Sequence, residues 1–235
     1  MFFGAAMEEE AVVVVRELKI CLPVYKIVYS VFFIIILCLV RGITNTDEIG
    51  IALEPAVAIL TAAFCADTYV QEIVSGRSEI HRLYPMNKRI FSVFRRVLIQ
   101  GMFLLILSVL GYGLFLFFQR PYSVGGMAGI KCEMYLFFTY VAAVVVTICF
   151  WEMFSVVFSC LFRNMWAGIA CSLVVWIVTD SSKGQMLFGK WNLFSYTFRD
   201  TENYADVSWL CGKVMCIFFV VIMLVAIPAI LKKRG

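Results

Sequence analysis

Charged residues are scarce in this chain of 235 residues. Asp, Glu, Lys and Arg make up 15% of the sequence and apolar residues 63%, with a mean hydropathy of +0.92. An ordinary soluble domain carries about 25% charged residues and roughly half apolar ones. The scarcity of charge therefore excludes a soluble globular protein and indicates an integral membrane protein.

Histidine is almost absent, since His81 is the only one. A single histidine excludes HExxH metalloproteases and the intramembrane proteases that pair glutamates with several histidines. The sequence also lacks a Walker A pattern, so the chain cannot hold ATP phosphates on its own, and it lacks a GxSxG elbow. We therefore expect a protein that is not itself an enzyme, with His81 at a surface or a subunit contact.

Paired metal-binding cysteines are missing as well. The nine cysteines show no CxxC or similar spacing, and most lie in apolar runs, where they act as small hydrophobic residues. No metal or other cofactor is therefore expected on this chain. Cys132 and Cys211 fall near the expected outer surface, and a disulfide between them stays an open alternative. The cations behind the net charge of +4 gather at expected membrane borders, which argues against a nucleic acid partner.

Six apolar runs predict an all-α protein with six transmembrane helices, because a helix needs about 20 apolar residues to cross the hydrocarbon core. Their approximate ranges are 21–40, 55–74, 98–118, 135–160, 165–179 and 209–231. The fifth run is short and needs flanking residues to span. Residues 7–20 open with three glutamates and continue with an aliphatic stretch, which predicts a helix lying in the membrane interface. A disordered tail is the alternative for this segment.

Positive charge is unevenly distributed between the connections. With both termini inside, 13 Lys and Arg residues lie in inner segments and 7 in outer ones. The outer seven are Arg41, Arg120, Lys131, Lys183, Lys190, Arg199 and Lys213. Inner loops of membrane proteins carry an excess of Lys and Arg. The sequence therefore predicts a multi-pass protein of the cell membrane with cytoplasmic N- and C-termini.

The segment 71–97 joins the second and third runs and holds six cations. Part of it follows an E-x3-G-x2-E-x3-L-x-P pattern, with an arginine four residues after the proline. The pattern consists of Glu72, Gly76, Glu79, Leu83, Pro85 and Arg89, and Arg77 follows the glycine. In its residues and its place in the topology, this segment resembles the first cytoplasmic loop of ABC-2-type permeases, the membrane subunits of a class of ATP-driven transporters.

The resemblance covers nearly the whole chain and implies a coupling helix within 71–97 that docks on a separate ABC ATPase dimer. ATP and Mg would bind to that partner, and a second permease chain, identical or different, would complete the pathway in the lipid bilayer. The implied function is export of an amphipathic or hydrophobic cargo from a bacterial cell, with an antimicrobial or toxic peptide as the leading candidate. A non-transporting membrane-embedded interaction protein and a secondary transporter or channel are the alternatives.

The last outer connection, 180–208, is rich in aromatic and aliphatic residues. Irregular backbone enters a membrane only where protein or water satisfies its polar groups. We expect a partly re-entrant helical hairpin or an aromatic cap over the bundle, and a plain interfacial aromatic belt is the alternative. The segment Trp191–Tyr196 resembles the aromatic loop of ABC-2 permeases, so Trp191 and Phe194 are candidate pathway or interface residues.

Three of the ionisable residues inside the apolar runs are Lys26, Asp67 and Glu152, and charge at such positions is costly and points to function. Lys26 lies close to the inner end of the first span, and snorkelling accounts for it. Asp67 and Glu152 lie about 10 Å deep, by the helical rise of 1.5 Å per residue. Both are candidates for a pathway or subunit interface, and pairing or protonation within the protein is the alternative.

Overall fold

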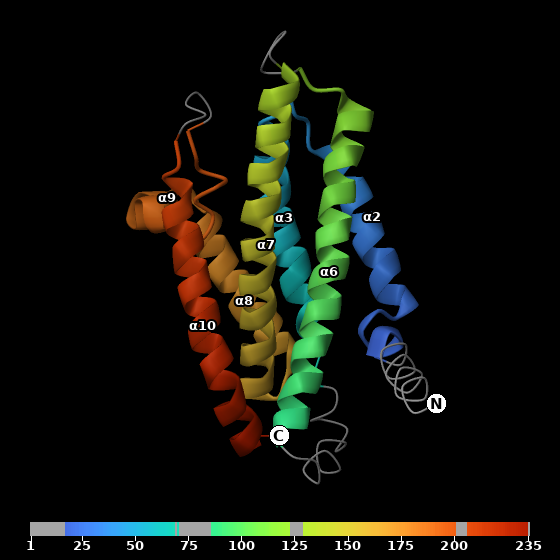
Figure 1. Ribbon diagram of the computed structural model, residues 1–235, viewed down its shortest axis with the longest axis vertical. Coiled ribbons are helices and arrows are strands. Elements are labelled where there is room, and N and C mark those ends of the chain that lie inside the picture. Colours follow the sequence, from blue (N-terminus) through green and yellow to red (C-terminus); the bar gives the residue numbers. More distant parts are fainter. Residues whose placement is uncertain (1–16, 69, 71–85, 123–128, 201–205, 235) are drawn as a thin grey trace, which may run out of the picture.

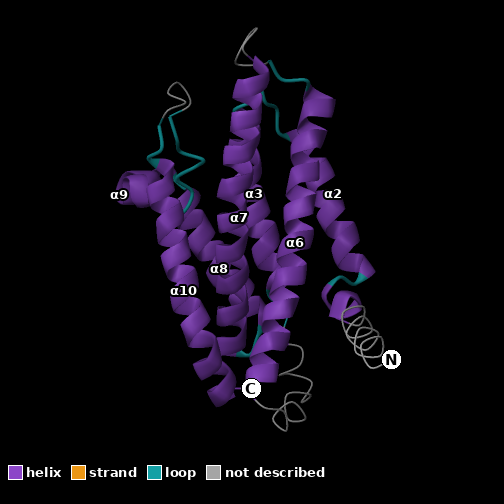
Figure 2. Ribbon diagram, in the orientation of Figure 1, coloured by secondary structure: helices purple, strands orange, loops and turns teal. Residues whose placement is uncertain are grey.

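A computed structural model of the protein describes residues 17–68, 70, 86–122, 129–200 and 206–234. Within these residues the regular structure is helical and no strand occurs, which confirms the all-α prediction. Asn45 and Tyr122 form an isolated bridge that ties together two connections between helices. Figure 2 shows helices along the length of the molecule, with short loops at their ends.

The described helices form an up-and-down bundle (Figure 1). They are α2 (Val24–Val40), α3 (Glu48–Cys65), α6 (Met86–Gln119), α7 (Gly129–Phe162), α8 (Met165–Asp180), α9 (Ser182–Phe188), the 3-10 turn η2 (Gly189–Trp191) and α10 (Trp209–Arg234). We call the end where α2 begins and α10 ends the lower end, and the end where α2 ends and α3 begins the upper end. Helix α3 therefore ends, and α6 begins, at the lower end.

Among the described residues, four helices are long and apolar enough to cross a membrane: α3, α6, α7 and α10. Helix α8 is long and apolar enough to cross a membrane only together with the segment 182–191, from which it is bent by 77°. Counting this bent pair as one span gives five, and α2, with 17 residues, is a shorter apolar helix. Several long apolar helices thus indicate a multi-pass membrane protein.

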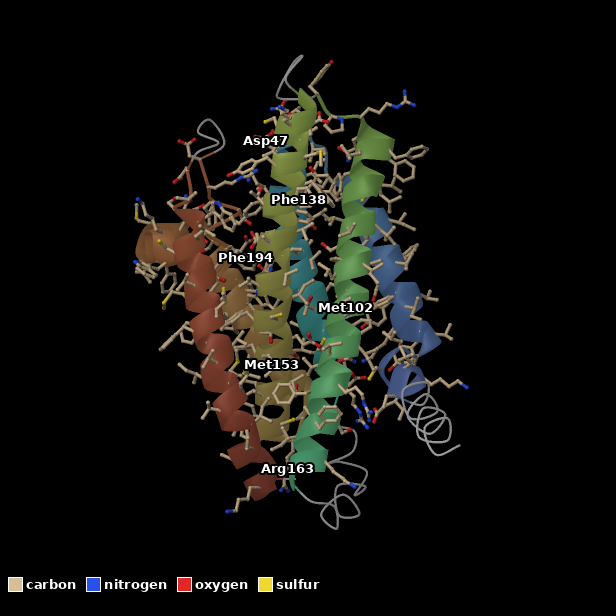
Figure 3. The ribbon with its side chains drawn as sticks, in the orientation of Figure 1. Asp47, Met102, Phe138, Met153, Arg163 and Phe194 are labelled. Carbon is tan, nitrogen blue, oxygen red and sulfur yellow. The ribbon has the colours of Figure 1, made fainter. Side chains whose placement is uncertain are left out.

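The outside of the bundle is apolar, as a lipid-facing surface requires. Large hydrophobic side chains are exposed on every long helix except the enclosed α3, among them Phe32, Ile106, Phe138, Val174 and Val225. Phe138 projects from the side of α7 in Figure 3. Exposed apolar surface of this extent is not tolerated by soluble monomers. The inside, in contrast, holds several buried charged residues, which are described below.

Helix α3 forms the centre of the molecule, where it packs against α2, α6, α7 and α8. Phe64 of α3 is fully buried and stacks on Phe103 of α6 with ring centroids 5.4 Å apart. Ser155 of α7 donates a hydrogen bond to the carbonyl of Ala62 at 2.6 Å. Trp176 of α8 donates its indole N–H to the carbonyl of Pro55 at 2.8 Å. Helices α6, α7 and α8 are thus each fixed to α3 by side-chain packing or a hydrogen bond.

The bounds of α3 differ from the expected span 55–74. The helix begins seven residues earlier, at Glu48, whose carboxylate accepts hydrogen bonds from the backbone N–H of Thr44 at 2.7 Å and of Asn45 at 3.4 Å. Pro55 consequently lies inside the helix rather than at its first position. Helix α3 ends at Cys65, followed by a turn in which the Thr68 N–H donates to the Cys65 carbonyl.

The remaining runs lie inside longer helices or match them closely. Helices α6 and α7 have 34 residues each and contain the expected spans 98–118 and 135–160. Helix α8 matches 165–179 to within one residue, and α10 contains 209–231. Of the expected interfacial segment 7–20, only residues 17–20 belong to the described residues, and they are helical.

Candidate functional site

The aromatic segment after η2 is folded into the upper part of the bundle. Phe194, labelled in Figure 3, is 0% exposed. Its ring stacks on that of Trp151 of α7, with centroids 5.7 Å apart. Asn192 donates to the carbonyl of Thr179 at 2.8 Å and accepts from the Phe194 N–H at 2.9 Å. Trp191, by contrast, is 56% exposed. The structure therefore separates these two aromatic candidates: Phe194 belongs to the core and Trp191 to the surface.

Two glycines let this segment approach the helices closely. A Cβ on Gly212 of α10 would lie 1.9 Å from the Asn192 carbonyl oxygen, and a Cβ on Gly50 of α3 would lie 2.8 Å from the Tyr196 hydroxyl. Tyr196 is buried, and burial raises the pKa of its phenol to about 12, although the nearby Arg199 lowers it in part. The phenol is therefore neutral at physiological pH. The segment is held by close backbone packing as well as by aromatic contacts.

A charged cluster lies directly beneath this segment, and we call it the Glu54 network: Glu54 of α3, Thr147 of α7, Lys213 of α10 and Thr197. Glu54 is 0% exposed and Lys213 is 3% exposed, and the two form an ion pair. Thr147 and Thr197 lie 2.8 Å from the two carboxylate oxygens and can each donate to them. The Lys213 ammonium also donates to Thr147 at 2.8 Å and to the carbonyl of Leu193 at 3.0 Å.

The Glu54 network satisfies a demanding electrostatic condition. Removing a carboxylate and an ammonium from water costs several kcal/mol for each ion, which is recovered only when charge and hydrogen bonds are matched. Here both carboxylate oxygens are hydrogen-bonded, and the ammonium has three acceptors. The network joins three helices and the aromatic segment, so it fixes the upper half of the bundle.

The sequence-based assignment of Lys213 to an outer loop is wrong. Lys213 lies within α10, four residues after its start, and Glu54 lies six residues after the start of α3. At 1.5 Å per residue these depths are roughly 6 Å and 9 Å from the same end of the bundle. Opposite charges at similar depths below the same membrane face indicate that two residues can pair. The hydropathy pattern does not reveal this pair, because each residue stands close to the end of an apolar run and is assigned to the neighbouring loop.

A second ion pair lies at the lower end, between Lys26 of α2 and Asp67, two residues after α3. Lys26 is buried, donates to the carbonyl of Phe64 at 2.7 Å, and has its ammonium 4.9 Å from the centre of the Phe64 ring. The snorkelling interpretation is therefore wrong for Lys26, because its ammonium points into the bundle. Asp67 is a structural partner of α2 in this arrangement.

A further cluster at the lower end ties α6 to the residues before α2. Arg96 donates to the Glu17 carboxylate at 2.6 Å, and Arg95 contacts the same carboxylate at 3.4 Å. Gln100 of α6 donates to the carbonyl of Cys21 at 3.4 Å and lies 2.6 Å from the hydroxyl of Thr68. Helix α6 thus enters the bundle through a set of polar contacts.

Glu152 of α7 differs from these charges. Its side chain is 2% exposed, and its one hydrogen bond is a weak contact from the Cys65 thiol, with S and O 3.6 Å apart. Within the described part of the chain, no ion pair to Glu152 occurs. The structure therefore does not join Asp67 and Glu152 in one acidic pair: Asp67 turns toward α2, and Glu152 lies between α3, α6 and α7.

The expected coupling residues fall largely outside the described residues. This applies to Glu72, Gly76, Arg77, Glu79, Leu83 and Pro85. Arg89 belongs to the first turn of α6, but its side chain is likewise outside the described set. All nine cysteines are free thiols, Cys132 and Cys211 included. Among the described residues, no group of three His, Cys, Asp or Glu side chains is placed to hold a metal ion.

The chain matches no protein-family model, no curated protein and no solved structure. Function must therefore be argued from the molecule itself. The buried charges of the described residues include ion pairs that join helices and the carboxyl group of Glu152, which has no ion pair there.

Proposed function

We propose that this chain is the membrane-embedded permease subunit of an ATP-driven exporter of the ABC-2 type. The observation that carries the proposal is the sequence pattern from Glu72 to Arg89, which follows α3 along the chain and runs into the first turn of α6. With α2 and the bent α8–α9 pair counted as spans, the chain has six, as the resemblance implies. The buried aromatic segment before α10 then corresponds to the partly re-entrant element of such permeases.

The distribution of charge supports a cytoplasmic lower end. Lys26, Arg96 and Lys213 are buried in ion pairs, so we leave them out of the count of loop cations. The remaining cations divide 11 to 6 between the expected inner and outer segments. The positive-inside bias then orients the segment 71–97 toward an ATPase in the cytoplasm.

Export would divide the work between chains. An ATPase dimer, holding ATP and Mg, would close and displace the coupling segment. Helix α6 follows that segment directly and is bonded through Arg96 and Gln100 to residues before α2. The displacement would therefore act on α6 and α2 together, while the Glu54 network holds α3, α7 and α10 as one unit. A second permease chain would complete the path.

The proposed cargo is an amphipathic peptide, taken from the cytoplasm or the inner leaflet. An apolar bundle surface and the buried carboxyl group of Glu152, which has no ion pair among the described residues, favour a hydrophobic body with positive charge over a sugar or an inorganic ion. Asp67 is engaged with Lys26, so attraction of a cationic cargo would depend on Glu152.

The coupling role is tested by co-purification with a nucleotide-binding subunit and by charge reversal at Glu72 or Glu79. We expect the variants to reach the membrane in normal amounts but to uncouple ATP hydrolysis from transport, as would a bulky residue at Gly76. Glu133→Lys is the matched control, since Glu133 lies on α7 far from the coupling segment. A purified chain that never associates with an ATPase would overturn the proposal.

The cargo is tested by stimulation of the partner ATPase. A cationic amphipathic peptide should stimulate hydrolysis more than a phospholipid or a neutral hydrophobic drug, and Glu152→Gln should reduce the response to the peptide. Stimulation by lipid or drug alone, unchanged by Glu152→Gln, would contradict the peptide assignment and leave the permease assignment intact.

The second candidate is a membrane-embedded interaction protein without an ATPase. The buried ion pairs favour it, because Glu54–Lys213 and Lys26–Asp67 lock helices together rather than line an open path. This candidate predicts that charge reversal in the coupling segment has no effect on any ATPase, and the co-purification experiment distinguishes the two.

A further inference from the structure

A groove of about 450 Å³ runs between α6 and α7. Its walls are apolar and include Leu98, Met102 and Leu105 of α6 and Val145 and Ile148 of α7. Leu98 and Met102 are largely exposed on the outside of the bundle, where Figure 3 shows Met102 on α6. The groove is therefore open to the lipid that surrounds an embedded bundle.

A carboxyl group lies at the floor of this groove. Glu152 lines it from α7, and Gly101 lines it from α6. A Cβ on Gly101 would lie 2.8 Å from Oε2 of Glu152, so the glycine leaves the space that the carboxyl group occupies. The neighbouring Cys65 thiol is a weak donor and carries no charge at neutral pH to balance a carboxylate.

The one cation that lines the groove is engaged elsewhere. Arg95 lines its lower part, with its guanidinium 3.4 Å from the Glu17 carboxylate and 5.7 Å from the centre of the Phe91 ring. A positively charged ligand would be repelled from that lower part. Its apolar body would therefore extend the other way from Glu152, along Leu105 and Val145.

We propose that this groove binds amphiphilic amines, with the ammonium group at Glu152 and the apolar body between α6 and α7. An ionised carboxylate buried without a counter-charge is strongly unfavourable, and a bound ammonium supplies that counter-charge. Burial of the body against the apolar walls adds hydrophobic stabilisation. A lipid chain would fill the groove between the apolar walls but would leave the carboxylate without a positive charge beside it. The site belongs to this chain alone and does not depend on an ATPase or on export.

The experiment uses the purified full-length chain in lipid nanodiscs and the fluorescent amine monodansylcadaverine. Its emission rises in apolar surroundings, and empty nanodiscs give the background. We expect saturable binding of one amine per chain. The N-acetylated analogue has the same body without the charge, and its binding should be roughly tenfold weaker or more, the size expected for the loss of a charged hydrogen bond.

Variants locate the site. Glu152→Gln keeps the shape of the side chain and should weaken amine binding by the same roughly tenfold factor, while leaving the weak binding of the acetylated analogue unchanged. Glu133→Gln makes the same change on the same helix outside the groove and should bind as the unaltered chain does. Met102→Trp fills the groove without touching the carboxyl group and should abolish binding of both probes.

Three results would overturn the proposal: equal binding of the amine and its acetylated analogue, normal amine affinity in Glu152→Gln, or normal affinity in Met102→Trp. Because Met102 is on the exposed wall, Met102→Trp remains decisive if Glu152→Gln fails to fold. Binding by the unaltered chain is measured without ATPase, so its failure is distinct from a failure of the export proposal.

Discussion

Glu54 brings a carboxylate into the centre of an apolar bundle, and each of its oxygen atoms has a partner there. Such a group depends on its neighbours more than an apolar residue does. When one member of a buried ion pair is removed, the other stays buried without compensation, whereas removal of both members is often close to neutral. The Glu54 network therefore predicts strong coupling between Glu54 and Lys213.

We expect Lys213→Met alone to destabilise the protein by about 3–5 kcal/mol, because it leaves Glu54 unpaired. The double variant Glu54→Gln with Lys213→Met should recover much of that loss. Lys232→Met removes an exposed lysine from the same helix and is the control. Thermal unfolding of the detergent-solubilised proteins, followed by size-exclusion chromatography, measures the effect. Equal stability of Lys213→Met and the control would show that the pair contributes nothing.

At the scale of elements, the aromatic segment after η2 depends on the close approach of α10. We expect Gly212→Ala to push the backbone at Asn192 away from α10, since the added Cβ would lie 1.9 Å from its carbonyl oxygen. The expected loss is about 1–3 kcal/mol, typical of an overpacked contact. Limited proteolysis of the segment 189–208, compared with the unaltered chain, should reveal its release.

Gly113→Ala on α6 is the matched control, because a Cβ there would have no neighbour within 4 Å. This change replaces glycine within a helix and should be neutral or stabilise by up to about 1 kcal/mol. If the two variants behaved alike, the close approach at Gly212 would have no energetic importance.

The extent of the helices could largely be predicted, and the charged contacts could not. Local hydropathy places 98–118, 135–160 and 209–231 inside α6, α7 and α10 because long apolar runs leave a helix few alternatives. It places the start of α3 too late, because the charged Glu54 is taken as the boundary before the apolar run, whereas the helix begins at Glu48. In the fold, Glu54 is balanced by Lys213, which is 159 residues away in sequence, and no local pattern contains that information.

The candidate site divides in the same way. The hydropathy pattern singles out both Asp67 and Glu152, because a carboxyl group in an apolar run is rare. It could not distinguish Asp67, which pairs with Lys26, from Glu152, which lacks an ion pair among the described residues. Whether each carboxyl group meets a cation depends on the direction of its side chain after α3 or on α7. That direction is set by how the helices pack.

At the scale of the whole molecule, the up-and-down arrangement determines which helix ends share one end of the bundle, whichever way the protein is inserted in the membrane. The end of α3 and the start of α6, which flank the segment 71–85 along the chain, lie at the same end of the bundle as the start of α2 and the end of α10. We expect this end, and the segment 71–97 with it, to be cytoplasmic. A single cysteine at Ser78, introduced into a chain without its nine native cysteines, should react with a membrane-impermeant maleimide only after the cells are opened.

The control for this labelling is a cysteine at Ser182, the first residue of α9, which is expected outside and should react in intact cells. Labelling of Ser78→Cys in intact cells would reverse the orientation. It would also remove the basis for an ATPase contact at the lower end, because that contact requires the segment 71–97 to face the cytoplasm.

The distance along the chain between Glu54 and Lys213 also sets an order of assembly. Synthesis proceeds at about 5–20 residues per second, so roughly 8 to 30 seconds separate the appearance of the glutamate from that of its lysine. During this interval α3 has already left the ribosome with a carboxyl group that lacks its partner. Only an α10 inserted with Lys213 at the matching depth completes the contact. The ion pair thus makes correct insertion of the last described helix a condition for completing the contacts of α3. A chain interrupted before Lys213 keeps the Glu54 carboxyl group without its ion-pair partner.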